Sequence, residues 1–138
     1  MADAAARELK ILVVDDDAVD RRAVRRALAK AGVAAEVRDA GAVLPAINLL
    51  ATESFDCVFL DFNLPDGDGL TFLRGVRAAG ISTPVVMLTG QQDERLEGEL
   101  AASGAADYIA KAALTPARLC ESLQRAVPGW TGTAPPNR

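Results

Sequence analysis

The sequence of 138 residues contains no histidine. This absence excludes a Ser-His-Asp triad, a Cys-His nucleophile pair and a zinc site with histidine ligands. It also means that the chain has no histidine of its own that could carry a phosphoryl group.

Cysteines and long apolar runs are scarce. Cys57 and Cys120 lie far apart and form no CxxC or similar metal spacing, so both are predicted to be small buried apolar residues in a reducing compartment. No segment approaches ~18 consecutive apolar residues, and the first ten residues lack the apolar core of a signal peptide. We therefore expect a soluble, cytoplasmic protein with no membrane partner.

The chain also has no excess of basic over acidic residues. The net charge is −4 and the pI is about 4.8, which argues against a nucleic-acid partner, because nucleic acids bind basic surfaces. Half of the residues are apolar, so the chain is large enough to fold as one domain without a disulfide or a structural metal. Proteins and small ions are the expected partners.

The most informative segment is a short apolar run that ends at a carboxylate. Residues 57–60 (CVFL) are followed directly by Asp61, and Pro65 and Gly67 come soon after. A continuous apolar run bounded by turn residues is typical of a strand buried on both faces of a parallel sheet. We expect Asp61 at the carboxyl end of a central strand, the edge where open α/β sheets bind ligands.

Apolar runs and helical periodicities alternate along the whole chain. The predicted strands cover residues 10–14, 34–40, 57–60, 84–88 and 107–110, and the predicted helices cover residues 18–31, 41–51, 70–79, 93–103 and 115–126. Five strand-then-helix units predict an α/β fold, a doubly wound five-stranded parallel sheet with right-handed crossovers and helices on both faces.

Some segments carry further expectations. Glu36 and Arg38 interrupt the second strand, which favours a place near the sheet edge. Gly98 weakens the fourth helix by about 1 kcal/mol relative to alanine, and soft elements are the ones that move. From Pro128 onward the sequence has no periodicity, so we expect one domain over residues 1–127 and a flexible tail or linker stump over residues 128–138, with Trp130 against the last helix.

In a parallel sheet the carboxyl ends of all strands lie at one edge. The strands of this chain deliver there Asp15, Asp16, Asp17, Asp61, Thr89 and Lys111. Converging carboxylates repel one another, so they must take up protons or bind a cation, and a cluster of oxygen ligands alone favours Mg²⁺ over Zn²⁺. A hydroxyl and an ammonium beside them suit phosphoryl oxygens. These side chains together predict phosphoryl transfer to a carboxylate nucleophile.

Four segments carry a resemblance to a known family. They are ILVVDDD (residues 11–17), VFLDFNLPDGDGL (58–70), VVMLTG (85–90) and GAADYIAK (104–111). In this order and spacing, the chain resembles the receiver domain of bacterial two-component response regulators over about residues 8–127. The resemblance implies a CheY-like, flavodoxin-like fold with strand order 2-1-3-4-5.

The resemblance also implies a role for each of the acidic residues and for Asn63. Asp61 would be the residue that is phosphorylated. Asp16 would bind Mg²⁺ directly and Asp15 mainly through water, while Asn63 would contribute its backbone carbonyl. Mn²⁺ is the expected substitute for Mg²⁺.

Other family roles fall on residues from later strands. Thr89 would bond a phosphoryl oxygen and Lys111 would pair with the phosphate. Tyr108 occupies the position of an aromatic switch that turns inward when Thr89 moves, although without the resemblance it would be taken as a half-buried strand residue. Asn63 and Gln91 occupy positions that tune dephosphorylation, and both are amides that could orient a water molecule, so we expect a phosphoryl lifetime of minutes or less.

The implied function is phosphorelay signal transduction, without turnover of a substrate in the manner of an enzyme. The phosphoryl group would come from a sensor histidine kinase or a histidine phosphotransfer protein, or from a small phosphodonor. The face over residues 93–126 would then change its contacts with a downstream effector protein, in a monomer or a homodimer. The chain would be a single-domain regulator or part of a larger regulator or hybrid kinase.

One departure from the family concerns the residue after Lys111. The family commonly has proline there, often with a cis bond, whereas this chain has Ala112. A cis bond before a residue other than proline costs about 2.5–4 kcal/mol, so either the bond is trans and the following loop differs, which we expect, or strain is held locally.

Three alternatives involve these residues. A haloacid-dehalogenase-type phosphatase has its nucleophile first and its acidic pair last, whereas here Asp15 and Asp16 precede Asp61, and Asn63 stands where that enzyme needs an acid. A calcium loop starting at Asp61 fails because Phe72 replaces the final glutamate. An interaction scaffold that is never phosphorylated stays open.

Overall fold

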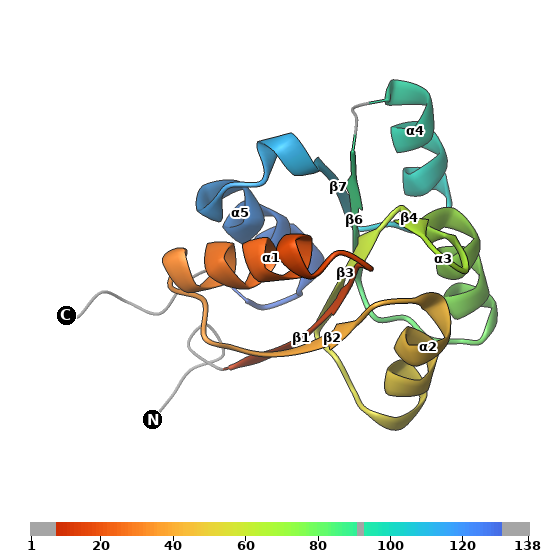
Figure 1. Ribbon diagram of the computed structural model, residues 1–138, viewed down its shortest axis with the longest axis horizontal. Helices are drawn as coiled ribbons and strands as arrows, with labels where there is room; N and C mark the ends of the chain where they lie inside the picture. The colour runs from red at the N-terminus through yellow and green to blue at the C-terminus, as the bar shows by residue number, and fades with distance from the viewer. Residues whose placement is uncertain (1–7, 91–92, 131–138) are drawn as a thin grey trace.

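The computed structural model describes residues 8–90 and 93–130. A central parallel sheet has the strand order β2-β1-β3-β6-β7 (Figure 1). Its strands are β1 (Leu9–Val14), β2 (Ala35–Ala40), β3 (Cys57–Asp61), β6 (Val85–Thr89) and β7 (Asp107–Ala110). In chain order this is 2-1-3-4-5, so the predicted topology is confirmed, and the interrupted strand β2 lies at the sheet edge.

Helices follow each strand of the sheet. They are α1 (Ala18–Lys30), α2 (Val43–Thr52), α3 (Gly69–Ala78), α4 (Glu94–Ala102) and α5 (Pro116–Ala126). Helices α1 and α5 cover one face, and α2, α3 and α4 cover the other (Figure 1). Four of the five helices of the described residues begin at a capping side chain, with α2 as the exception; Asp17 caps α1, and Thr115 caps α5 just before Pro116.

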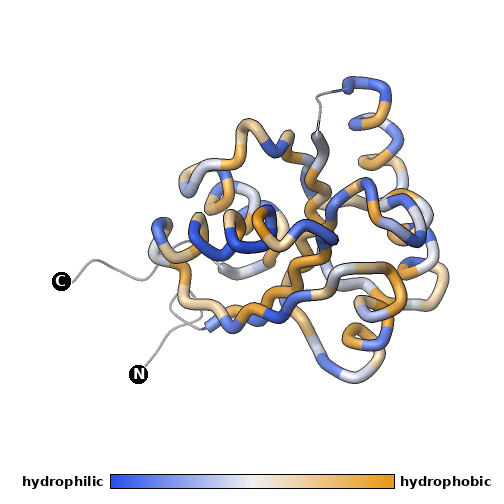
Figure 2. The backbone as a smooth tube through the Cα atoms, viewed as in Figure 1, coloured by the Kyte–Doolittle hydropathy of each residue, from blue (hydrophilic) through white to orange (hydrophobic). Residues whose placement is uncertain are grey.

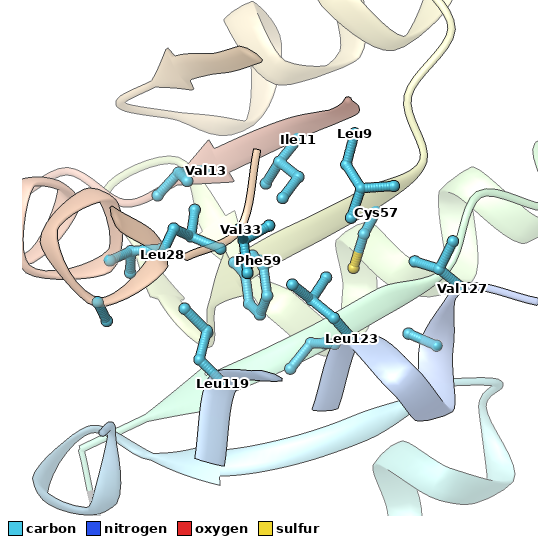
Figure 3. Close-up of a cluster of buried hydrophobic side chains, with 14 of the residues drawn as sticks. Leu9, Ile11, Val13, Leu28, Val33, Cys57, Phe59, Leu119, Leu123 and Val127 are labelled. Atoms are coloured by element: carbon cyan, nitrogen blue, oxygen red, sulfur yellow. The ribbon is translucent and has the colours of Figure 1, made fainter. Parts of the chain in front are cut away.

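Two apolar clusters hold these layers together. Side chains that alternate along β1 and β3 point to opposite faces, so Ile11 and Phe59 pack toward α1 and α5, whereas Leu12 and Leu60 pack toward α2 and α3. Figure 2 shows the hydrophobic residues concentrated along the central strands, and Figure 3 shows the first cluster, to which β1, β3, α1 and α5 contribute. Strands β1, β3 and β6 are buried on both faces, as their apolar runs predict, whereas the edge strand β2 is mostly exposed or half-buried.

The structure also departs from the sequence-based expectations at several places. A small antiparallel hairpin, β4 (Asn63–Leu64) and β5 (Gly67–Asp68), follows β3 and was not predicted. Helix α2 begins at residue 43, two residues later than expected, because residues 41–42 are extended or bent. Cys57 is buried as predicted, but Cys120 is only partly buried.

Further observations concern the end of the chain and its peptide bonds. A turn of 3₁₀ helix, η2 (Lys111–Ala113), follows β7, and no peptide bond between described residues is cis, so the Lys111–Ala112 bond is trans. Trp130 is 4% exposed and belongs to the cluster that includes Leu119 and Leu123 of α5. None of the described helices is both long and apolar enough to cross a membrane.

Candidate functional site

The carboxyl edge of the sheet collects the side chains that the sequence singles out. Asp15 directly follows β1, Asp61 ends β3, Thr89 ends β6 and Lys111 directly follows β7. A hollow of about 440 Å³ opens at this edge. It is lined by Asp16, Asp17, Asp20, Asp61, Asn63, Leu64, Pro65, Gly90 and Lys111.

Three carboxylates converge at this hollow. Asp15, Asp16 and Asp61 each offer one oxygen, and these oxygens all lie within 4.8 Å of one another. Asp15 and Asp61 are buried, whereas Asp16 is exposed. Oxygen ligands at this spacing, two of them out of bulk water, fit a hard divalent cation such as Mg²⁺.

Lys111 reaches across the hollow to three acids. Its Nζ lies 2.7 Å from Asp20 Oδ2, 2.9 Å from Asp15 Oδ2 and 3.4 Å from Asp61 Oδ2. Burial opposes the charged form of Lys111, but the hydrogen bonds to Asp20 and Asp15 and the charge of Asp61 outweigh it and raise the pKa of the ammonium group. Lys111 therefore stays a cation at neutral pH.

Opposing effects act on the pKa of the Asp61 carboxyl group. Burial of its carboxyl group and the charge of Asp15 raise its pKa to about 6, although Lys111 and the backbone N–H of Asn63 pull in the opposite direction. That N–H lies 3.3 Å from Asp61 Oδ1. At neutral pH Asp61 is mostly ionised, and the neighbouring positive charge only partly balances its negative charge. A bound cation would stabilise this ionised form.

Backbone contacts fix Asp15 from two sides. The N–H of Asp17 donates to Asp15 Oδ1 at 2.9 Å, and Arg21 Nη1 donates to the backbone oxygen of Asp15 at 2.6 Å. Asp17 itself accepts from the N–H of Val19 and caps α1. Asp17 therefore differs from Asp15 and Asp16, because its carboxylate caps α1.

The remaining predicted residues lie beside the acids. Thr89 is buried and lines a neighbouring hollow of about 390 Å³, together with Asn63 and Gly90. Asn63 and Gly90 line both hollows. The hydroxyl of Tyr108 accepts from the N–H of Asp93 at 3.0 Å, which joins β7 to the start of α4. Gln91 lies outside the described residues.

The comparisons with known proteins agree with this geometry. Residues 11–124 match the response regulator receiver domain family. This chain belongs to that family. Receiver domains of this family act in two-component signalling, and the order β2-β1-β3-β6-β7 with five helices is their CheY-like fold.

Individual relatives show the extent of the likeness. The response regulator MprA from Mycobacterium sp. (strain KMS) is 38% identical over 105 residues, which make up 75% of this chain and 44% of that protein. The chemotaxis response regulator CheY4 of Vibrio cholerae has 31% identity and a TM-score of 0.76, over 88% of this chain and 100% of that chain. The BeF₃-activated receiver domain of DrrB from Thermotoga maritima has 28% identity and a TM-score of 0.73, over 86% and 97%. The receiver chain spans less than half the length of the curated relatives it matches.

Sequence reasoning missed one acid of this receiver site. Asp20 makes the shortest contact of Lys111, at 2.7 Å, yet it stands inside α1 and not at a strand end. A signal for it exists, because Asp20 follows Asp16 by four residues and the first turn of α1 begins at the hollow. A search along the first turn of the helix after the acidic run would have found it.

Proposed function

We propose that Asp61 accepts a phosphoryl group from a phosphohistidine of a partner protein in a Mg²⁺-dependent reaction. The observation that carries this proposal is the convergence of Asp15, Asp16 and Asp61 within 4.8 Å, with the Lys111 ammonium 3.4 Å from Asp61. Asp15, Asp16, Asp61 and the backbone carbonyl of Asn63 would hold the cation, and Mn²⁺ would substitute. When bound, the cation supplies positive charge beside the phosphoryl oxygens.

The residues of the chain provide the rest of the chemistry. A carboxylate oxygen of Asp61 forms a bond to phosphorus while the bond from phosphorus to the imidazole nitrogen of the partner breaks, and the electron pair stays on that nitrogen. Lys111 donates to an oxygen of the transferred group, and the Thr89 hydroxyl donates to another. Transfer ends with an aspartyl phosphate on this chain and a histidine on the partner.

The new charge would change contacts elsewhere. The aspartyl phosphate carries up to about −2 where the Asp61 carboxylate carried −1, and this additional negative charge draws Lys111 and Thr89 toward it. Tyr108 touches the start of α4 through Asp93, so a movement of Thr89 would reach α4 and the face over residues 93–126. This face is the proposed contact surface for a downstream effector or for a second copy of the chain.

The proposed partners follow from the chemistry. A sensor histidine kinase or a histidine phosphotransfer protein would supply the phosphoryl group, because this chain has no histidine. The unpaired thiols of Cys57 and Cys120 support a cytoplasmic location. The domain predicted over residues 1–127 stays a proposal, and because Trp130 packs into the core we propose that it extends at least to that residue.

Incubation with acetyl phosphate tests the function against the scaffold alternative. Intact-mass spectrometry should show one added phosphoryl group on the wild type with Mg²⁺ and none with a chelator. D61N should show none, whereas the control E36Q, which removes an exposed carboxylate on β2 far from the acidic cluster, should react like the wild type. A wild type without adduct, or a D61N variant that still reacts, would favour the scaffold.

The lifetime of the phosphoryl group is a separate prediction. Asn63 borders the hollow at Asp61, and its amide could orient a water for hydrolysis, as could that of Gln91. We expect loss of radiolabelled phosphate within minutes. Retention of the label over many hours would contradict this role for the two amides.

A further inference from the structure

The hairpin between Asp61 and α3 has little packing at its tip. Residues 65–68 are exposed, and the hairpin borders an apolar cavity of about 310 Å³ between α2 and α3. Val43, Ile47, Gly67, Thr71, Phe72 and Gly75 are among the cavity lining. A methyl group placed on Gly75 would meet nothing within 4 Å. The tip of the hairpin therefore needs an attachment other than burial.

Asp66 provides such an attachment at the start of α2. The N–H of Val43 donates to Asp66 Oδ1 at 2.8 Å, and the N–H of Leu44 donates to Asp66 Oδ2 at 3.3 Å. Helix α2 has no cap of its own, because the residue before it is Ala42 and no side chain there makes a capping bond. A carboxylate from a loop more than twenty residues later thus takes the place of the usual cap.

The same hairpin carries the backbone of Asn63. Asn63 pairs with Asp68 across the hairpin, and Leu64 pairs with Gly67. At the base, the N–H of Gly69 donates to the carbonyl of Phe62 at 2.6 Å. The base is therefore fixed by backbone bonds next to Asp61, and the tip is fixed to α2 by Asp66.

We propose that Asp66 is a positioning residue for the phosphoryl-transfer site. It ties the hairpin to the N-terminus of α2 and thereby holds the backbone carbonyl of Asn63 where it can serve as a cation ligand. This inference rests on the proposed function, in which that carbonyl helps to hold Mg²⁺. Residues that orient ligands without touching the metal commonly change metal affinity when they are removed.

A purely structural role of Asp66 must be separated from this one. If Asp66 only caps α2, its loss lowers stability and nothing else. Ala42 has the extended backbone of a capping position, so A42S offers α2 a cap of its own without adding charge. The double variant D66A/A42S restores the cap but leaves the hairpin unattached.

The experiment measures Mg²⁺ affinity by calorimetric titration, the melting temperature, and amide hydrogen exchange of residues 62–69. D66A is expected to weaken Mg²⁺ binding by about tenfold and to speed exchange in the hairpin. D66A/A42S should regain melting temperature but not Mg²⁺ affinity. T115A, which removes the cap of α5, should lower the melting temperature and leave Mg²⁺ affinity unchanged.

A further variant separates attachment from charge. D66N keeps an oxygen acceptor for Val43 but removes the negative charge, so it should bind Mg²⁺ nearly as well as the wild type. Binding by D66N as weak as by D66A would overturn the inference, and so would recovery of Mg²⁺ affinity in D66A/A42S. If the wild type binds no Mg²⁺, the proposed function fails. The amide exchange of residues 62–69 then tests by itself whether Asp66 attaches the hairpin to α2, and unchanged exchange in D66A would show that it does not.

Discussion

Asp61 shows how a single residue can be set up for chemistry at a cost to stability. Its carboxyl group is buried beside Asp15, and its pKa is raised to about 6. Lys111 relieves part of this repulsion, but its ammonium lies closer to Asp20 and Asp15 than to Asp61. The Asp61 carboxylate is therefore only partly neutralised, and in the proposed reaction a divalent cation would supply the missing positive charge.

The pH dependence of stability tests this incomplete neutralisation. The pKa of Asp61 is higher in the folded chain than the ~3.9 of an unfolded aspartate, so the favourable contribution of its proton is lost as the pH rises from about 4 to about 6. Asparagine cannot ionise, so D61N should gain stability over the wild type across this window, by about 1–2 kcal/mol at neutral pH without divalent cations. Urea unfolding at several pH values measures the difference. An offset that does not vary with pH would contradict the raised pKa.

Among the elements, α4 is built to be the least secure helix on its face. In its sequence ERLEGELAA only Leu100 is buried, and the exposed Gly98 stands in the middle. Asp93 caps it, and the N–H of Asp93 also donates to Tyr108. A helix with so little buried surface can change its position at small cost.

Glycine substitutions test this softness. A methyl group on Gly98 would meet nothing within 4 Å, so G98A should stabilise the protein by about 0.5–1 kcal/mol and slow amide exchange in α4. G75A, equally unobstructed in α3, is the matched control: it should stabilise without slowing exchange in α4. G69A should destabilise instead, because its methyl group would lie 2.7 Å from Met87 Sδ. Equal exchange of α4 in G98A and wild type would contradict the account.

The larger elements were predictable because their signals are local. Buried strands give unbroken apolar runs, and helices give spacing and caps, so β3 and α5 follow from the sequence alone. The β4–β5 hairpin was missed because two-residue strands produce no periodicity. The contacts of Asp20 with Lys111 and of Asp66 with α2 were missed because both acids lie away from the strand ends of the central sheet, and their partners are 91 and 23 residues away in the sequence.

At the scale of the whole molecule, the acidic residues and Trp130 lie in different parts of the fold. The acids gather at the carboxyl ends of the strands, while Trp130 packs into the cluster formed by α1, α5 and the sheet. The N–H of Trp130 donates to the carbonyl of Val127, which continues the packed chain past the end of α5. The described structure therefore remains ordered core for three residues beyond the expected domain boundary at residue 127.

Removal of Trp130 tests the extent of the folded unit. W130A should lower the free energy of unfolding by about 3 kcal/mol or more, because a buried indole leaves a cavity. V19A, which shortens a side chain that is 62% exposed, should change it by less than about 0.5 kcal/mol. Denaturant unfolding followed by circular dichroism gives both values. If W130A is as stable as V19A, residue 127 is the better boundary.

The most direct test of the central claim locates the phosphoryl group on the chain. After reaction with acetyl phosphate and Mg²⁺, borohydride reduction converts an aspartyl phosphate into homoserine, which peptide mass spectrometry can place. The account predicts homoserine at residue 61, dependent on Mg²⁺ and absent at Asp15, Asp16 and Asp20. Homoserine at one of those three positions, or at none under any condition, would contradict it.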